Sequence, residues 1–167
     1  MGPDAHLLHY PIGERADTVN FLAVLEGPEP WTGPGGGPAP AAPGELAAAF
    51  AGWAPAVRQM VTAVPQSERW PLYTLPPMRR WSRGRLVLLG DAAHTMLPHQ
   101  GQGANQTIED AAVLAGCLLA AGSRAGAHRD AFARYESLRR ARTRQVQRSS
   151  LVTSALLLSL IHISEPT

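Results

Sequence analysis

The residues best suited to chemistry lie between positions 84 and 116, where an apolar run leads into a Gly-Asp pair. The run at residues 85–89 is typical of a parallel strand that is covered on both faces, and it ends at Gly90 and Asp91. Such a strand delivers the Asp91 carboxylate to the carboxyl edge of the sheet, where open α/β folds bind their ligands. At that edge the carboxylate can accept hydrogen bonds from the hydroxyl groups of a sugar or polyol.

The loop after Asp91 favours ligand contacts made by the main chain. Gly101 and Gly103 leave the backbone bare, so a planar group can approach the amides within hydrogen-bond distance. We predict a helix from about Asn105 to about Ala121, whose first turn presents free N–H groups and the positive end of the helix dipole. A ligand atom that carries negative charge suits this position. A strand-turn-helix without any ligand is the alternative.

The elements that must position this loop can be predicted from residue types and spacing. Residues 6–12 and 17–26 alternate and are rich in β-branched and aromatic side chains, which predicts an antiparallel pair. The Pro- and Gly-rich residues 27–43 indicate an exposed loop. Apolar residues recur at spacings of three and four from Glu45 to Val64, which predicts a core-facing helix that Pro55 breaks into two pieces. We also predict a short strand at 70–75 and a last helix at 127–150.

Other candidate chemical groups have plainer interpretations. The histidines at 6, 9, 94 and 99 have no carboxylate or thiol at ligand spacing, so we expect no metal site and interpret them as ordinary loop or strand residues. Cys117 lies among apolar residues of a helix and is expected to be a buried, inert thiol. Tyr10 faces either a ligand or the core. A solvated surface is the interpretation for six arginines of the last helix: Arg134, Arg139, Arg140, Arg142, Arg144 and Arg148.

Composition excludes some classes of function. The 167 residues suffice for one domain with a core, and the net charge is only +2, with all 15 basic residues arginine, which argues against a nucleic-acid binder. A single cysteine favours a reducing compartment, so a cytoplasmic protein is expected. The longest apolar run, residues 151–163, is too short for a comfortable membrane span.

The stretch GDAAHTMLPHQGQGANQTIEDA closely resembles the second flavin-binding motif of the class A FAD-dependent aromatic-ring monooxygenases, the family of salicylate and para-hydroxybenzoate hydroxylases. The resemblance implies that Asp91 binds the ribityl chain of FAD. It also implies that backbone amides of the following loop lie near N1 and the C2 carbonyl of the isoalloxazine ring. The residues implied to line that ring are Pro98, Gly101, Gln102, Gly103, Ala104 and Asn105. It assigns no catalytic side chain.

The same resemblance implies an α/β fold: the C-terminal part of a Rossmann-like, doubly wound FAD/NAD(P)-binding domain joined to a mixed-sheet substrate domain. Residues 1–76 are then part of the substrate-binding domain, with 27–43 as a flexible loop and Tyr10 as a candidate contact of the substrate ring. Residues 77–122 form the second half of the FAD-binding domain, and 123–150 the C-terminal helix. The implied reaction hydroxylates a small phenol-like substrate with FAD, NAD(P)H as electron donor, and O2.

The sequence also departs from the family pattern. A Gly-x-Gly-x-x-Gly turn after an N-terminal strand does not occur, because no apolar strand precedes the glycines at 33–37. We therefore expect the chain to be the C-terminal half of a longer enzyme, with the N-terminal half as its partner. Residues 151–167 do not resemble the family, and we expect a non-native tail there, with a short packing helix as the alternative. A partner-binding remnant or another flavin oxidoreductase, of halogenase or reductase type, remains an alternative function.

Overall fold

A computed structural model of the chain describes residues 5–27 and 30–159. The described residues separate into two compact units, the first comprising those up to Leu72 together with residues 156–159, and the second Tyr73–Ala155. The described residues contain no helix that is long and apolar enough to cross a membrane.

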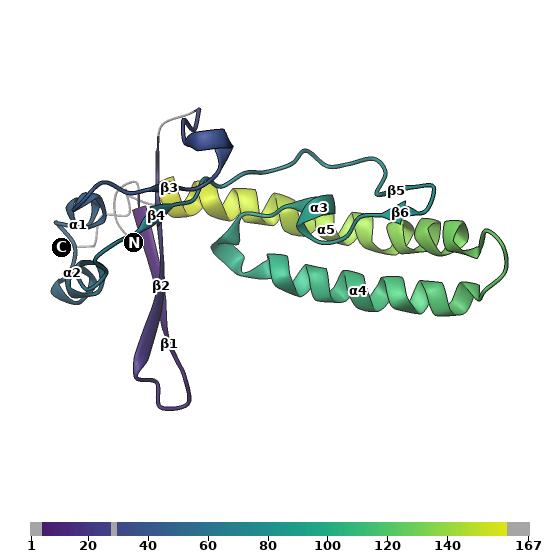
Figure 1. Ribbon diagram of the computed structural model, residues 1–167, viewed down its shortest axis with the longest axis horizontal. Coiled ribbons are helices and arrows are strands. Elements are labelled where there is room, and N and C mark those ends of the chain that lie inside the picture. Colours follow the sequence, from purple (N-terminus) through teal and green to yellow (C-terminus); the bar gives the residue numbers. More distant parts are fainter. Residues whose placement is uncertain (1–4, 28–29, 160–167) are drawn as a thin grey trace, which may run out of the picture. The chain divides into compact units, whose positions relative to one another are not determined.

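A β-hairpin opens the first unit. Strands β1 (Ala5–Ile12) and β2 (Thr18–Leu25) pair antiparallel, with Ala5 opposite Leu25 and Ile12 opposite Thr18 (Figure 1). The predicted strand pair is therefore confirmed. Because alternate side chains of a two-stranded ribbon point to opposite faces, the hairpin keeps several large apolar residues exposed, among them Leu8 and Val19.

Two short helices cover the base of this hairpin. Helix α1 (Glu45–Ala49) and helix α2 (Pro55–Thr62) are separated at Pro55, as the sequence predicts, because proline fits the first turn of a helix and not its interior. Phe50 is fully buried and meets the Trp53 ring edge-on at 4.8 Å between centroids. The small core of this unit is formed by Ala5, Phe50 and Val61, with Leu46, Trp53 and Val57 packed against it.

The segments on either side of these helices differ in part from the sequence predictions. The described part of the 27–43 loop holds a single 3-10 turn, η1 (Pro34–Gly36), and a two-residue strand, β3 (Ala39–Pro40), which pairs with β4 (Glu68–Arg69). The predicted strand at 70–75 is wrong: no strand forms there, and Trp70 is 67% exposed. Prolines at 71, 76 and 77 remove backbone donors, so this run of apolar residues cannot pair as a ladder.

The second unit begins with a hairpin and a helical turn. Strands β5 (Ser82–Arg83) and β6 (Leu86–Val87) pair antiparallel, and α3 (Asp91–His94) follows. The predicted parallel strand at 85–89 is thus wrong in length and pairing, and every strand pair that the structure describes is antiparallel. The end of the apolar run packs into the core instead, and the Leu88 amide donates to the Trp81 carbonyl at 2.8 Å.

Two long helices complete the second unit. After the 3-10 turn η2 (Pro98–Gln100), helix α4 (Gln102–Ala121) runs beside helix α5 (Ala127–Ser159) (Figure 1). Helix α4 therefore begins three residues earlier than predicted. Helix α5 continues into the segment where we expected a non-native tail, while the rest of that tail, residues 160–167, lies outside the described residues.

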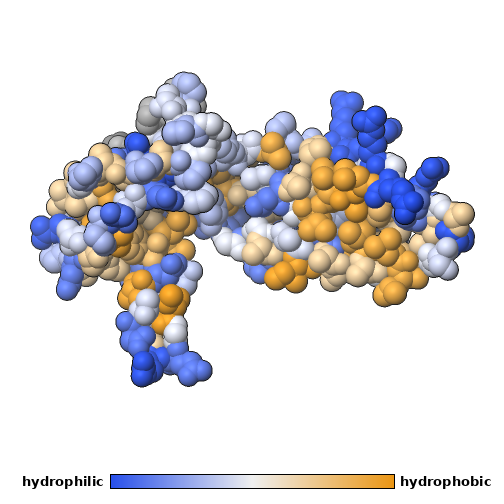
Figure 2. Space-filling model, in the orientation of Figure 1, coloured by the Kyte–Doolittle hydropathy of each residue, from blue (hydrophilic) through white to orange (hydrophobic). Residues whose placement is uncertain are grey.

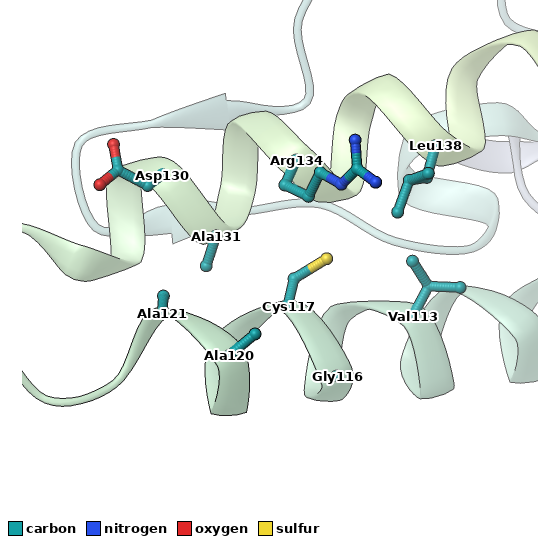
Figure 3. A pocket seen from close by; sticks show the side chains of 9 residues that line it. All are labelled: Val113, Gly116, Cys117, Ala120, Ala121, Asp130, Ala131, Arg134 and Leu138. Atoms are coloured by element: carbon teal, nitrogen blue, oxygen red, sulfur yellow. The ribbon is translucent and has the colours of Figure 1, made fainter.

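The core of this unit lies where α3, α4, α5 and the β5–β6 segment meet. Its buried members are Trp81, Ala93, Cys117, Ala131 and Tyr135. The Trp81 ring packs at 5.3 Å from the His94 ring and 5.6 Å from the Tyr135 ring. The expected burial of the Cys117 thiol is confirmed. A shallow, mostly apolar groove runs along the two helices above this thiol (Figure 3), and none of the predicted ligand-binding residues lines it.

Candidate functional site

The turn that follows β6 requires glycine at its centre. Gly90 has φ 58° and ψ −142°, a conformation that is essentially restricted to glycine. A β-carbon built on Gly90 would lie 2.7 Å from Thr107 Oγ1 and 3.0 Å from Thr107 Cγ2. The backbone of the turn is therefore pressed against α4, and this contact fixes where Asp91 begins α3.

Gly90→Ala is expected to lower the free energy of unfolding by at least ~2 kcal/mol, because it adds both backbone strain and a clash. Thr107→Ala in the same protein should restore only part of the loss, since it removes the clash and leaves the positive φ. The thermal unfolding midpoint measures both effects. Gly116→Ala is the matched control, because that glycine lies inside α4 and an added β-carbon meets nothing within 4 Å. A Gly90→Ala midpoint equal to that of the control would contradict the prediction.

Asp91 faces the first turn of α4. It is exposed, and its carboxylate Oδ1 lies 3.7 Å from the position of a β-carbon on Gly103. Its main-chain carbonyl accepts a hydrogen bond from Thr95 Oγ1 at 2.7 Å. Among the described residues, no hydrogen bond or ion pair occupies the carboxylate itself. The structure thus brings two predicted site residues, Asp91 and Gly103, to the same space and leaves an acceptor available there.

The loop that leads into α4 presents main-chain donors to this space. Gly101 adopts the left-handed conformation at φ 61° and caps α4 without any side-chain hydrogen bond. The amides at the start of a helix have no carbonyl partner within the helix, and the helix dipole adds partial positive charge there. The remaining predicted residues are all in this loop or in the first turn of α4: Pro98, Gln102, Ala104 and Asn105.

Tyr10, the predicted substrate contact, belongs to the other unit. It lies on β1 opposite Asn20 and is 48% exposed. The alternative that Tyr10 is a core residue is therefore wrong, and its contact with a substrate stays a prediction.

Helix α5 holds the loop between α3 and α4. The Gln147 side-chain amide donates to the main-chain carbonyl of Thr95 at 3.1 Å. The Gln100 side-chain amide donates to Ser149 Oγ at 2.9 Å and to Thr153 Oγ1 at 2.6 Å. Thr153 lies within the expected tail, so the first residues of that segment take part in the contact. Both ends of the loop are thereby tied to one helix.

A buried carboxylate joins the Gly90 turn to α4 and α5. Asp110 is fully buried, and its Oδ2 accepts a hydrogen bond from the Gly90 amide at 2.9 Å and lies 2.5 Å from His94 Nε2. Its Oδ1 accepts from Arg139 Nε at 2.7 Å. Three donors from three segments therefore converge on one side chain.

Arg139 extends the network along α4. Its guanidinium donates to Glu109 Oε2 at 2.5 Å and to Gln106 Oε1 at 2.8 Å, besides its bond to Asp110. The prediction that the arginines of this helix are all solvated is wrong for Arg139, which is 5% exposed. Burial is tolerated because two carboxylates and an amide satisfy the planar fork of donors.

The network keeps Asp110 ionised. Burial alone would raise the pKa of this carboxyl, but hydrogen bonds from His94, Arg139 and the Gly90 amide outweigh it and lower the pKa from 3.8 to about 2. Because the pKa in the folded state is below the unfolded value, the contribution to stability is complete above about pH 4 and is lost as the pH falls towards 2. The Arg139 hydrogen bond likewise lowers the pKa of Glu109.

His94 was interpreted from the sequence as an ordinary loop or strand histidine, and the structure places it in this network instead. Its partner Asp110 is 16 residues away, and only the fold of α3 against α4 brings the two together. Within residues 5–27 and 30–159, no three His, Cys, Asp or Glu side chains form a group that could hold a metal ion.

Comparison with known proteins agrees with this geometry. The model of a family described as FAD binding domain matches residues 57–150, more than half of the chain. The chain belongs to this FAD-binding domain family, and the predicted resemblance to flavin-dependent monooxygenases is confirmed.

The chain is also similar in sequence to monooxygenases of known name. The chain is 47% identical over 150 residues to 3-amino-4-hydroxybenzoate 2-monooxygenase PtmB3 of Streptomyces platensis, covering 90% of this chain and 36% of that protein. It is 40% identical to 6-hydroxynicotinate 3-monooxygenase of Bordetella bronchiseptica, covering 88% of this chain and 37% of that protein.

A solved salicylate hydroxylase substrate complex superimposes with a TM-score of 0.77 at 30% identity, covering 94% of this chain and 39% of that one. The predicted fold class, part of an FAD-dependent monooxygenase, is confirmed. The chain spans just over a third of the length of the relatives it matches.

Proposed function

We propose that this chain supplies the isoalloxazine and ribityl side of an FAD site in a flavoprotein monooxygenase that hydroxylates a small aromatic substrate. The observation that carries the proposal is the Asp91 carboxylate, which has no partner among the described residues and faces the bare first turn of α4. In this assignment Asp91 accepts hydrogen bonds from ribityl hydroxyls. The segment that lines the flat ring is Pro98, Gly101, Gln102, Gly103, Ala104 and Asn105.

The described residues fit such a cofactor. A β-carbon at Gly103 would point into the space beside Asp91, so the glycine keeps open the place where a planar ring can lie. The free amides and dipole at the start of α4 stabilise negative charge on the cofactor edge that they face. Bound FAD, reduced by NAD(P)H, supplies the redox chemistry with O2 by which one oxygen atom enters the ring of the substrate.

The substrate class is proposed from the relatives. Their names specify hydroxylated aromatic acids, 3-amino-4-hydroxybenzoate and 6-hydroxynicotinate, which supports a small phenol-like ring here. We assign residues 1–76 to the substrate-binding domain, with Tyr10 as a candidate contact. Residues 77–122 are assigned to the FAD-binding domain and 123–150 to the C-terminal helix. We propose the remaining part of the same enzyme as partner and a cytoplasmic setting, supported by the lone buried thiol of Cys117.

Asp91→Ala in the complete enzyme is expected to weaken FAD binding by roughly 10-fold or more. A hydrogen bond to a charged acceptor contributes about 1.5–3 kcal/mol, and 1.4 kcal/mol corresponds to a tenfold change in affinity. Fluorescence titration of the apoenzyme with FAD measures the dissociation constant.

Asp130→Ala is the matched control for this titration. Asp130 is an exposed carboxylate of the same unit that pairs with Arg124 on the surface. Its removal should change the dissociation constant by less than about 2-fold, because exposed ion pairs contribute little. Equal FAD affinity in the Asp91→Ala variant and the wild type would remove the ribityl assignment.

A further inference from the structure

We propose that Asp110 and Arg139 are positioning residues for the flavin site: the Asp110 carboxylate sets the orientation of the Gly90–Asp91 peptide, and Arg139 holds that carboxylate in place. The inference rests on the proposed function of Asp91. Neither side chain reaches the space beside Gly103, so neither is a catalytic residue. Their effect on the cofactor passes through the backbone of the turn.

The turn depends on outside support. Its central residue has a backbone conformation that is unfavourable for most residues, and such conformations persist only where the surroundings fix them. Both polar groups of Gly90 are engaged: the amide donates to Asp110, and the carbonyl accepts from the amides of Ala93 and His94, each at 2.9 Å. The orientation of Asp91, the next residue, follows from these three bonds.

Only a carboxylate satisfies all the donors around position 110. The Gly90 amide and Arg139 Nε approach different oxygens of the same group, and both are obligate donors. An asparagine in this place would direct its NH2 group at one of the two, whichever way the amide is turned. Asp110→Asn therefore keeps the shape of the side chain, but its NH2 group then faces a second buried donor with no acceptor between them.

Arg139 fixes the carboxylate through a fork of donors. It contacts Asp110, Glu109 and Gln106, three side chains of α4 that lie within two turns of the helix. Lysine would keep the charge but offers one nitrogen in place of three. Arg139→Lys therefore loosens the carboxylate without leaving it unpaired, and it provides a second variant should Asp110→Asn fail to fold.

A double-mutant cycle in the complete enzyme tests the proposal. FAD dissociation constants are measured by fluorescence titration for wild type, Asp91→Ala, Asp110→Asn and the double variant. We expect Asp110→Asn alone to weaken FAD at least ~10-fold, and to add less than ~2-fold once Asp91 is already alanine, because it acts through that residue. Visible circular dichroism of the bound flavin should change in Asp110→Asn as well. Asp130→Asn is the control, because Asp130 is an exposed carboxylate of the same unit that pairs with Arg124 and lies outside the Asp110–Arg139 network.

The outcomes are distinct. If wild type does not bind FAD, the proposed function fails before the inference is reached. If wild type binds and Asp110→Asn binds equally well, the inference is overturned. If the two losses multiply in the double variant, Asp110 is merely a structural residue of the core and the positioning role is also overturned. Where Asp110→Asn does not fold, the same cycle is measured with Arg139→Lys. Losses of FAD affinity that are not additive with Asp91→Ala support the proposal, and additive losses overturn it.

Discussion

Gly103→Val is expected to release FAD from the complete enzyme while the fold of Tyr73–Ala155 persists. Gly103 lies inside α4 without a positive φ, so a side chain there meets no backbone strain. Its β-carbon would stand 3.7 Å from Asp91 Oδ1, an ordinary contact in the protein. The valine methyl groups would, however, extend into the space proposed for the flavin ring.

The matched control for this change is Gly116→Val, the same substitution in the same helix. A β-carbon at Gly116 meets nothing within 4 Å, so the change in helix propensity is shared by the two variants while the effect on the ligand is not. Flavin absorbance after gel filtration gives the bound fraction, and far-UV circular dichroism reports the helices. A yellow Gly103→Val protein with normal flavin spectra would show that the start of α4 faces solvent.

The second large effect concerns the chain by itself. We expect the isolated 167 residues to be colourless and inactive with NAD(P)H and salicylate-like phenols, whereas the complete enzyme should bind FAD and oxidise NAD(P)H when an aromatic substrate is present. FAD also carries a pyrophosphate, which proteins of this type cradle at a glycine-rich turn before a helix. The 167 residues contain no Gly-x-Gly-x-x-Gly segment after an apolar strand.

The surface of the second unit supports the same expectation. Apolar side chains gather over its helix pair on the face shown in Figure 2. Ile108 is 68% exposed, Leu119 83% and Leu86 61%. Exposed apolar patches of this kind favour association, so we expect the isolated chain to be poorly soluble or loosely packed.

Flavin absorbance together with far-UV and near-UV circular dichroism of the isolated chain measures these properties. A well-folded monomer that binds one FAD per chain would contradict the expectation. A complete enzyme that ignores FAD would instead favour a non-catalytic remnant.

Helices can be predicted from the sequence because the spacing of apolar residues is enough to indicate them. The spacing from Glu45 to Val64, with proline at 55, was enough to place α1 and α2, and the apolar run before Gly122 placed α4. The candidate site residues of the turn and α4 can be proposed as a group from the sequence, since they all lie between positions 91 and 105. Elements that are formed by residues close together in the chain can therefore be predicted from local sequence patterns.

The errors have a common physical origin in contacts between distant residues. Strands need partners, and neither residues 70–75 nor residues 85–89 find the neighbours that their composition favours. The burial of Arg139 depends on Asp110, 29 positions earlier, and this partner cannot be identified from the residues around Arg139. One signal was available: Tyr135, Arg139, Thr143 and Gln147 recur every four residues, a spacing that indicates a single buried face despite its polar composition.

That polar face gives α5 a constraint on length that apolar helices do not share. An apolar helix face can shift or rotate slightly and still make hydrophobic contacts, because such contacts are not directional. The polar side chains of α5 instead contact individual partners on separate segments: Glu136 with Ser82, Arg139 with Asp110, Gln147 with Thr95 and Ser149 with Gln100. Inserting one residue within this stretch would turn everything beyond it by about 100°, so that the later partners could no longer be reached together with the earlier ones. We therefore expect substitutions on the outer face of this helix to be tolerated, whereas an insertion or deletion between its contacts breaks part of them.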